Sequence, residues 1–346
     1  MKIYDCFQFF DENMMLDLRL NILNKHVHKF VIVENSFMHS GIKKKPVFNI
    51  NNFPKFKDKI IYILVDKLPE GLFDVDKIKD KDTKDNSPKA NMRKAMKIFA
   101  KTPTAVAAYF RCRKGKKIIS PDKKLSFSEN FFKMMFNKVP DKEIVRAFDI
   151  SLILYAEHSF NVSTFTARTI TSSLSDLHGA ITGAIASLKG PLHGGANEAV
   201  MHMMKEIGKP EKAKAWIENA LEKKKVVMGF GHRVYRTGDS RVPTMKHYMF
   251  KVAKLLKKEK YPKMYEILEK VMLEKKNIHP NVDFPCGPTY YMMGIDIDFY
   301  TPIFVMSRIT GWSAHIMEQH ASNKLIRPLS KYKGEEVRKV MLLNQR

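Results

Sequence analysis

Apolar residues occur in three short runs near the start of the chain. Residues 1–10 contain IYDCFQFF, residues 30–34 read FVIVE, and residues 60–66 read IIYILVD. Short apolar runs bounded by polar residues are typical of buried strands. The order strand, helix, strand, strand predicts the opening of a parallel α/β unit, with the helix over residues 11–24.

The predicted first helix carries its apolar residues at helical spacing. Met14, Met15, Leu18 and Ile22 recur at intervals that place them on one side of a helix. This spacing predicts a helix between the first and second strands.

A charged stretch follows the third apolar run. Residues 67–94 contain KIKDKDTKDNSPKA and few apolar residues that a core could bury. Such a composition is typical of a linker or a mobile surface segment. We therefore predict a charged linker over residues 67–94.

After the linker, the apolar residues follow a helical period, and no segment alternates as a strand would. The longest predicted helix, 163–188, is rich in Ser, Thr, Ala and Gly. Small residues allow two helices to approach closely, as at the centre of a bundle or at a subunit interface. The predicted helices span 95–113, 127–136, 141–156, 163–188, 196–207, 210–224, 243–258, 262–275 and 302–319.

Length and charge limit the classes of protein and partner. A chain of 346 residues predicts one large domain or two smaller ones. Its 61 Lys+Arg against 36 Asp+Glu give a net charge of +25, but the lysines are spread along the chain and no nucleic-acid-binding motif occurs. We therefore expect no nucleic-acid partner. No stretch approaches the roughly 20 apolar residues that cross a bilayer, so we expect no membrane partner either.

The cysteines indicate a reducing compartment. Cys6, Cys112 and Cys286 are odd in number and lack CxxC spacing. This pattern favours reduced thiols in a cytoplasmic protein and predicts no metal site.

Three stretches place a polar group beside glycine or proline at the boundary of an element. KGPLHGGANE (189–198) contains His193 on a predicted tight turn that opens a helix, where free N–H groups favour negative charge. GFGHRVYRTGDSR (229–241) contains His232, and NVDFPCGP (281–288) contains Asp283. Together they supply two histidines and one carboxylate for catalysis.

His193, His232 and Asp283, in this order and with these flanks, resemble the catalytic triad of the citrate synthase family, especially its bacterial citrate and 2-methylcitrate synthases. The resemblance runs from about Met96 to Tyr332. It implies a mostly α, two-domain helical fold over 95–346, in which a small domain of about 196–300 is inserted in the large domain. It also implies condensation of acetyl-CoA or propionyl-CoA with oxaloacetate, followed by release of CoA.

The chemistry of this family requires a base and two donors. Asp283, between apolar neighbours, suits the base that removes a proton beside the thioester. His193 suits a neutral donor to the enolate oxygen, because a helix N-terminus disfavours its charged form. His232 suits the group that polarises the oxaloacetate carbonyl and protonates the new alkoxide.

Two carboxylates on oxaloacetate require several fixed cations, preferably arginines. Arg241, Arg308 and Arg327 match family positions for the substrate carboxylates, and His158 matches a further oxaloacetate ligand. In the family, the equivalent of Arg327 reaches into the site of the partner subunit. The resemblance therefore implies a homodimer.

The resemblance also assigns residues to coenzyme A. The turn Gly229-Phe230-Gly231 would offer backbone groups to the adenine, and Arg236 matches a phosphate contact. Taken alone, GFG is a weak phosphate-loop signal, because its flanks fit no nucleotide-binding motif. We expect no permanently bound cofactor, since the acyl-CoA enters as a co-substrate.

The start of the chain is similar to a different family. YDCFQFF, LDLRLN, KFVIVE and HSG resemble the opening of glycosyltransferase family 17, the β-1,4-mannosyl-glycoprotein N-acetylglucosaminyltransferases, over residues 1–66. This piece stands where a citrate synthase carries several large-domain helices, so we expect an N-terminally truncated synthase fold behind a partial α/β segment. The alternatives are a glycosyltransferase fragment or a non-catalytic fusion in which the synthase part only dimerises.

Overall fold

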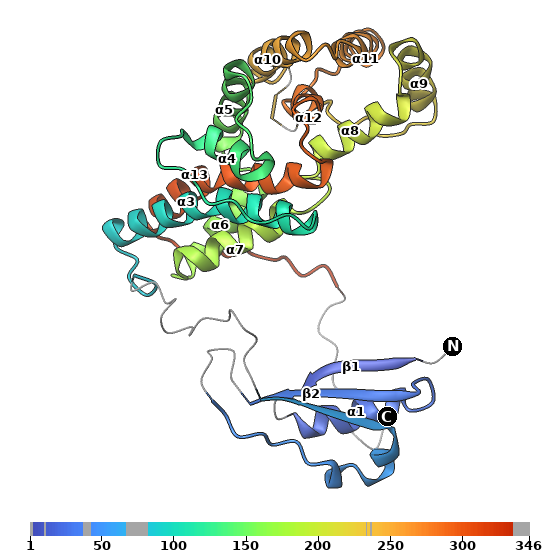
Figure 1. Cartoon of the computed structure of the whole chain (residues 1–346), viewed down its shortest axis with the longest axis vertical. Helices are drawn as coiled ribbons and strands as arrows, with labels where there is room; N and C mark the ends of the chain where they lie inside the picture. The colour runs from blue at the N-terminus through green and yellow to red at the C-terminus, as the bar shows by residue number, and fades with distance from the viewer. Residues whose placement is uncertain are drawn as a thin grey trace. The chain divides into compact units, whose positions relative to one another are not determined.

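The computed structural model describes residues 3–9, 12–36, 43–66, 82–232, 234–235 and 237–334 (Figure 1). The chain divides into two compact units, Met1–Lys81 and Asp82–Arg346. Within the described ranges, no helix has both the length and the apolar character that a membrane span needs.

The first unit is a small parallel sheet with one helix. The strand order is β1-β2-β3, with Cys6 opposite Val31 and Ile32 opposite Tyr62. The predicted parallel α/β opening is therefore confirmed. The elements are β1 (Tyr4–Phe9), α1 (Asn13–Leu23), β2 (Lys29–Asn35), the 3-10 helices η1 (Ile50–Asn52) and η2 (Pro54–Lys59), and β3 (Ile60–Val65).

The buried face of α1 differs from the face that the sequence suggests. Leu16 and Leu20, one helical turn apart, are buried in the small core. The apolar residues at the predicted spacing are exposed instead. The helix carries two apolar stripes, and periodicity alone does not indicate which of them a sheet covers. The exposed residues are Met14, Met15, Leu18 and Ile22.

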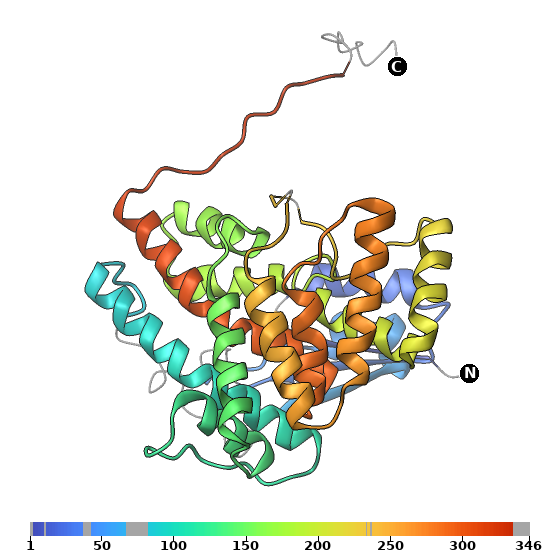
Figure 2. The same ribbon diagram turned by 90° about the horizontal axis from the view of Figure 1, so that it is seen from above.

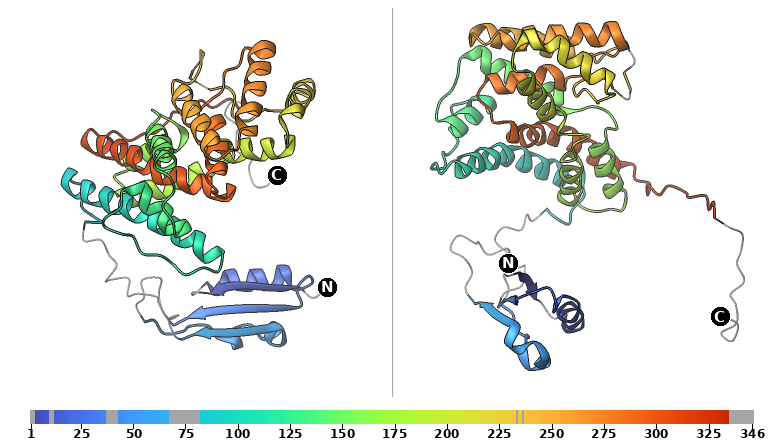
Figure 3. Two further views of the ribbon diagram at one scale, coloured as in Figure 1. Left: turned by 45° about the horizontal axis from the view of Figure 1, so that its top comes forward. Right: turned by 90° about the vertical axis from the view of Figure 1, so that its right-hand side faces the viewer.

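The second unit is helical. In it α13 packs against α3, α5, α6 and α7, and α12 packs against α8, α10 and α11 (Figures 1 and 3). Helices α8 to α12 cover the range of the predicted small domain. The elements are α3 (Pro88–Arg113), α4 (Phe127–Phe136), α5 (Lys142–Ala156), α6 (Val162–Ser172), α7 (Leu177–Leu188), α8 (Ala196–Ile207), α9 (Pro210–Glu222), α10 (Val242–Leu255), α11 (Lys260–Lys276), α12 (Asp283–Met292), η3 (Ile297–Phe299) and α13 (Tyr300–Ala321).

Three features of the helical unit differ from the sequence predictions. Helix α3 begins at Pro88, ahead of the predicted start at residue 95, because Ser87 caps it and proline suits its first turn. The helix predicted over 163–188 is two helices, α6 and α7, which pack against each other. Helix α12 was not among the predicted helices, since its Pro and Gly residues are unfavourable inside a helix.

Candidate active site

His193 lies in the turn between α7 and α8. Its backbone N–H donates to the Gly190 carbonyl at 2.9 Å, and the Gly194 N–H donates to the Leu188 carbonyl at 2.9 Å. A Cβ on Gly194 would lie 2.4 Å from that Leu188 oxygen, so only glycine fits. The predicted tight turn that opens a helix at Ala196 is confirmed.

Contacts with Ser163 on α6 determine the state of the His193 ring. Nε2 lies 2.8 Å from Ser163 Oγ, and the Ser163 backbone N–H donates to it at 3.3 Å. Because a backbone N–H can only donate, we assign Nε2 as the acceptor and place the ring proton on Nδ1. Burial, with a smaller contribution from the charge of Arg308, lowers the pKa of His193 to about 4. The ring is therefore a neutral N–H donor at pH 7.

Asp283 is the first residue of α12. Its N–H donates to Asn281 Oδ1 at 3.1 Å, which fixes the start of the helix. Further along, a Cβ on Gly287 would lie 2.6 Å from the Asn197 carbonyl oxygen of α8. The helix that begins at Asp283 therefore lies in close contact with the helix that follows His193.

The Asp283 carboxylate is held by a buried tyrosine. Tyr155 on α5 donates its hydroxyl proton to Asp283 Oδ1 at 2.5 Å. Burial raises the pKa of Asp283, and this effect exceeds the lowering by the Tyr155 hydrogen bond and by the charges of Arg241 and Arg308. A carboxylate that is ionised but poorly solvated is a stronger base than one in water.

Arg308 on α13 is a buried cation with an unused donor. Its side chain is among the most deeply buried, and the residue is only 2% exposed. Nε donates to the Tyr155 carbonyl at 2.7 Å, whereas Nη1 has no hydrogen-bond partner among the described residues. Burial lowers the pKa of Arg308 to about 10, so the guanidinium stays charged at pH 7. A buried guanidinium with a free N–H is suited to bind an anion.

Arg241, just before α10, is held by Asp239. Arg241 Nε donates to Asp239 Oδ1 at 2.9 Å, and Nη2 donates to Oδ2 at 2.7 Å. Oδ2 also accepts the Val282 N–H at 3.0 Å. The buried Asp239 thus fixes Arg241 and the residue that precedes Asp283 in one arrangement.

His232 and His158 lie edge to face, with ring centroids 4.9 Å apart. His232 Nδ1 accepts the N–H groups of Val234 at 3.1 Å and Tyr235 at 3.2 Å, which leaves the proton on Nε2. His158 Nε2 lies 3.0 Å from the Tyr235 hydroxyl. Burial lowers the pKa of His158 to about 4 and also lowers the pKa of His232.

These side chains form one electrostatically connected cluster. The charge of Arg308 acts on His193 and Asp283, and the charge of Arg241 acts on both other histidines and on the carboxylate. The structure therefore brings together all three residues predicted to be catalytic and three of those predicted to bind substrate. The cluster consists of His158, His193, His232, Arg241, Asp283 and Arg308.

The glycine turn predicted for coenzyme A lies against the first turn of α12. Gly229 and Gly231 have φ values of +84° and +78°, which favour glycine. The Asn281 N–H donates to the Gly229 carbonyl at 2.9 Å, and Asn281 Nδ2 donates to the Gly231 carbonyl at 3.0 Å. The Phe230 ring packs 4.4 Å from the Phe284 ring.

Two further predicted site residues are placed neither in this cluster nor in the glycine turn. Arg236 lies outside the described residues. Arg327 is exposed in the segment after α13, which leads away from the helices (Figure 2). The Ile326 N–H donates to Ser172 Oγ at 3.0 Å and so ties the start of this segment to α6. The role of Arg327 in a partner's site stays a prediction.

Comparison with known proteins identifies the family. Residues 64–329 match the family described as citrate synthase, C-terminal domain. Citrate synthase of Mycolicibacterium smegmatis is 49% identical over 82% of this chain and 78% of that protein. The chain belongs to the citrate synthase family. It is also 50% identical to 2-methylcitrate synthase of Mycobacterium tuberculosis, over 81% of this chain and 73% of that protein.

Solved structures of the citrate synthase family have the same fold. Citrate synthase from Thermotoga maritima matches with a TM-score of 0.67 and 35% identity, over 81% of this chain and 76% of that chain. The enzyme from Thermoplasma acidophilum, in ternary complex with carboxymethyl coenzyme A and oxaloacetate, matches with a TM-score of 0.68 and 34% identity, over 75% and 70%. The mostly helical, citrate-synthase-like fold predicted from sequence is confirmed.

Residues 1–102 match a second family, glycosyltransferase family 17. This match overlaps the citrate synthase match over residues 64–102. The second resemblance predicted from the opening of the chain is therefore also found. It covers the first unit and the beginning of α3.

Residues that the sequence did not indicate hold the side chains of this cluster in place. Tyr155 contacts Asp283 across 128 residues of sequence, and Ser163 contacts His193 across 30. No local pattern signals such long-range pairs. Asp239 is different, because it stands two positions before Arg241 in the GDSR turn, where a carboxylate beside an arginine suggests an ion pair.

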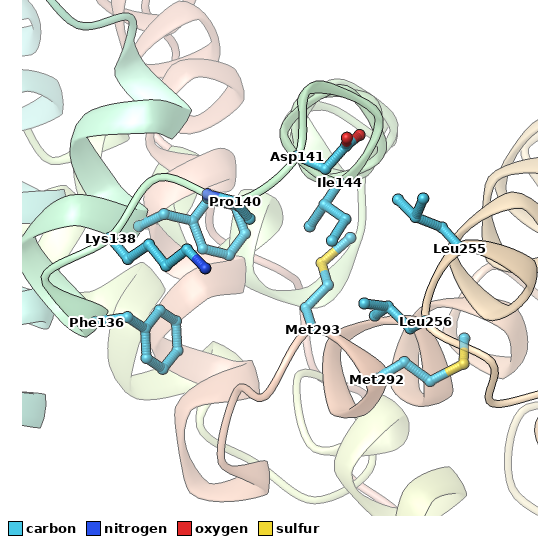
Figure 4. A pocket seen from close by; sticks show the side chains of 10 residues that line it. Phe136, Lys138, Pro140, Asp141, Ile144, Leu255, Leu256, Met292 and Met293 are labelled. Carbon is cyan, nitrogen blue, oxygen red and sulfur yellow. The ribbon is translucent and has the colours of Figure 1, made fainter.

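A separate hollow of about 380 Å³ lies at the other end of α12 (Figure 4). None of the predicted site residues lines it, and most of its lining is apolar. The described part of the chain contains no cluster of His, Cys, Asp or Glu arranged to hold a metal ion. The hollow is lined by Phe132, Phe136, Lys138, Pro140, Asp141, Ile144, Leu255, Leu256, Met292 and Met293.

Proposed function

We propose that this chain condenses an acyl-CoA with oxaloacetate and hydrolyses the thioester to release free CoA. The relatives compared above are citrate and 2-methylcitrate synthases, and the Thermoplasma enzyme was solved with a CoA derivative and oxaloacetate. Acetyl-CoA would give citrate, and propionyl-CoA would give 2-methylcitrate. One methylene contributes only about 1–3 kcal/mol to such a choice, so both substrates belong in the test.

The observation that carries this proposal is the buried Arg308 guanidinium, whose Nη1 has no hydrogen-bond partner among the described residues and whose charge acts on the half-buried Asp283. An unpaired buried N–H is costly unless a ligand accepts its hydrogen bond. A substrate carboxylate satisfies it with a strong charge-assisted bond. The same anion would lie close to the carboxylate that removes the proton from the second substrate.

In the proposed reaction, Asp283 removes a proton from the carbon beside the thioester. The electron pair moves onto the thioester oxygen, where the Nδ1–H of His193 donates to the enolate. The enolate carbon bonds to the ketone carbon of oxaloacetate. The Nε2–H of His232 donates to the former ketone oxygen and protonates it, and water then cleaves the thioester.

Neutral histidines suit these two donor roles. The pKa of His193, lowered to about 4 by burial, keeps its ring uncharged at pH 7. The pKa of His232 is lowered by the same cause. A neutral donor stabilises developing negative charge without first releasing its proton to solvent.

Arg241, Arg308 and His158 are proposed to bind oxaloacetate, with Arg327 completing the site from a second copy. An exposed apolar surface on and around α6 and α7 supports such a dimer. Exposed apolar side chains that lie close together commonly mark an interface. They are Phe160, Val162, Phe165, Leu174 and Ile185.

Gly229, Phe230, Gly231 and Arg236 are proposed to contact coenzyme A, which acts as a co-substrate rather than a resident cofactor. The tight turn, packed against the first turn of α12, supports this assignment. Glycines at positive φ leave backbone groups accessible to an adenine ring.

A thiol-release assay tests the proposed function. The purified chain should release free CoA from acetyl-CoA or propionyl-CoA only when oxaloacetate is present, and mass spectrometry should detect citrate or 2-methylcitrate. Equal release without oxaloacetate would indicate a plain thioesterase. No release by a folded dimer would favour the non-catalytic fusion.

Mixing variants tests the shared site. Neither Arg327→Ala nor Asp283→Ala homodimers should turn over. A mixture should regain activity, because one site of each heterodimer has both residues. Heterodimers that form and stay inactive would rule out the role of Arg327 in a partner's site.

The match to glycosyltransferase family 17 supports an alternative for the first unit, N-acetylglucosaminyl transfer. Incubation with a nucleotide-linked N-acetylglucosamine and a glycoprotein acceptor tests it. We expect no transfer, because we take the first unit to be only a partial glycosyltransferase segment.

A further inference from the structure

Tyr155 on α5 contacts two parts of the proposed active site. The residue is only 1% exposed, and its hydroxyl donates to Asp283 Oδ1 at 2.5 Å. Asn197 Nδ2 lies 3.4 Å from the same hydroxyl oxygen. Among the described residues, the second carboxylate oxygen of Asp283 accepts no hydrogen bond, so it is available to a substrate proton.

The backbone carbonyl of Tyr155 contacts the second part of the site, the Arg308 side chain. This carbonyl accepts the hydrogen bond from Arg308 Nε at 2.7 Å, and the Tyr155 ring packs 4.2 Å from the Phe304 ring. Arg308 in turn lies over Phe304. The hydroxyl therefore contacts the carboxylate while the carbonyl contacts the buried cation.

We propose that the Tyr155 hydroxyl is a positioning group for the base: it fixes the Asp283 carboxylate with one oxygen bound and the other directed to the acyl-CoA. This inference rests on the proposed condensation. Its separate content is that the hydroxyl acts on Asp283 and not on Arg308, since the contact with Arg308 is made by the backbone.

The charged groups around Asp283 oppose one another, so the hydrogen bond from the Tyr155 hydroxyl affects the pKa of the Asp283 carboxyl. Arg241 and Arg308 favour the charged carboxylate, whereas burial and the nearby Asp239 oppose it. Cys286, one turn along α12, is itself buried, and its pKa is raised to about 12 by burial, so it stays a neutral thiol. The only direct hydrogen bond to the carboxylate among the described residues comes from Tyr155.

Tyr155 acts only as a donor. Burial and the neighbouring carboxylate raise the pKa of its hydroxyl well above the ordinary range. The phenol is therefore protonated at every working pH and does not compete with Asp283 as a base. A hydrogen bond to the ionised carboxylate lowers its pKa, so loss of that bond raises the pKa.

The chain offers a matched control. Tyr290 on α12 is fully buried, and its hydroxyl lies 2.8 Å from Ser151 Oγ rather than from Asp283. Tyr155→Phe and Tyr290→Phe each remove one buried hydroxyl and keep the ring. Only the first removes a hydrogen bond from the base.

The test is the pH dependence of kcat/KM for the acyl-CoA at saturating oxaloacetate. In the wild type, activity should rise as pH rises through the pKa of Asp283. Tyr155→Phe should move this acidic limb upward by about one pH unit or more and lower kcat by about 10-fold. KM for oxaloacetate should stay within about twofold, because the carbonyl that holds Arg308 is unchanged. Tyr290→Phe should leave the limb in place.

The inference would be overturned if the acidic limb of the kcat/KM profile stayed in place in Tyr155→Phe. It would also be overturned if the limb moved equally far in Tyr290→Phe. An inactive wild type would instead refute the proposed function. Carbon-13 NMR titration of the Asp283 carboxyl, assigned with Asp283→Asn, tests the contact without activity. The carboxyl should titrate at higher pH in Tyr155→Phe than in the wild type, and equal titration would again refute the role of Tyr155.

Discussion

In each unit of the chain a carboxylate accepts a tyrosine hydroxyl. In the first unit, Tyr62 donates to Glu34 at 2.8 Å, and in the second unit Tyr155 donates to Asp283 at 2.5 Å. The two carboxylates differ in their other donors. Their pKa values consequently shift in opposite directions.

Glu34 on β2 is surrounded by donors. Its carboxylate accepts the N–H groups of Val47 at 2.8 Å and Phe48 at 3.1 Å, and it pairs with Lys44 at 3.2 Å. Burial alone would raise the pKa of Glu34, but these donors together with Tyr62 lower it. The carboxylate is stabilised on both oxygens and serves the structure of the loop after β2.

Among the described residues, Asp283 has one direct donor, Tyr155, and two nearby cations that do not hydrogen-bond to it. The effect of burial therefore exceeds that of the donor and the cations, and the pKa of Asp283 is raised. The comparison indicates that the number of direct donors, rather than burial or a tyrosine partner, separates a structural carboxylate from a basic one. A base requires an oxygen that the protein leaves unsatisfied.

The largest expected effect is a difference in turnover between variants that remove the charge of one or the other carboxylate. Asp283→Asn should lower turnover by a factor on the order of 10²–10⁴, because the base is lost while its shape is kept. Glu34→Gln should leave turnover unchanged. Steady-state CoA release measures both, and calorimetry should show that Asp283→Asn still binds oxaloacetate. Equal losses in the two variants would remove the distinction between the carboxylates.

A second comparison uses two buried arginines. Arg308 Nη1 has no hydrogen-bond partner among the described residues, whereas Arg111 on α3 donates to the carbonyls of Lys117 and Met135. Arg308→Met should weaken oxaloacetate binding by roughly 10- to 100-fold, since a charge-assisted hydrogen bond contributes about 1.5–3 kcal/mol. Arg111→Met should change stability and not affinity. Unchanged calorimetric affinity in Arg308→Met would contradict the anion site.

The smallest expected effect is on the stability of the first unit. Glu34→Gln should destabilise the first unit by about 1–3 kcal/mol, because four donors lose an ionised acceptor. Since the pKa of Glu34 is lowered on folding, its contribution is present above the ordinary glutamate pKa and is lost as pH falls through the folded value. Hydrogen exchange of the strand amides across this range measures the loss. Identical exchange in wild type and variant would show that these donors do not stabilise the loop.

Local signals explain which helices could be predicted from sequence. The predicted bounds 127–136 and 196–207 agree with α4 and α8. Ser126 and Glu129 form a capping box at the start of α4, and Asn137 ends it in the left-handed conformation. Helix α8 lies between Gly195 and Gly208. Such signals are contained within a few residues.

The remaining differences arise where the local signal misleads. Between α6 and α7, Leu174 takes φ +65° and Asp176 caps the next helix, although the helical period of small residues continues through them. In α12, Pro285 lies in the first turn, where no N–H partner is lost. The sequence placed this stretch at the boundary of an element without predicting the helix, and Asp283 is the first residue of that helix.

In the candidate site, the motif residues could be predicted from the sequence, whereas their long-range contacts could not. The flanks of His193, His232 and Asp283 indicated the family, which is confirmed, while the catalytic roles assigned to these residues stay predictions. The contacts of Tyr155 with Asp283 and of Asp239 with Val282 join distant segments, and they depend on how the helices pack. Sequence periodicity carries no information about such pairs.

Proton exchange tests the role of Asp283 most directly. In D₂O, with malate in place of oxaloacetate, the wild type should exchange deuterium into the carbon beside the acetyl-CoA or propionyl-CoA thioester, because malate offers two carboxylates and no ketone to attack. NMR follows the exchange. We predict that Glu34→Gln exchanges at the wild-type rate and that Asp283→Asn exchanges at least about 100-fold more slowly. Wild-type exchange by Asp283→Asn would contradict its assignment as the base.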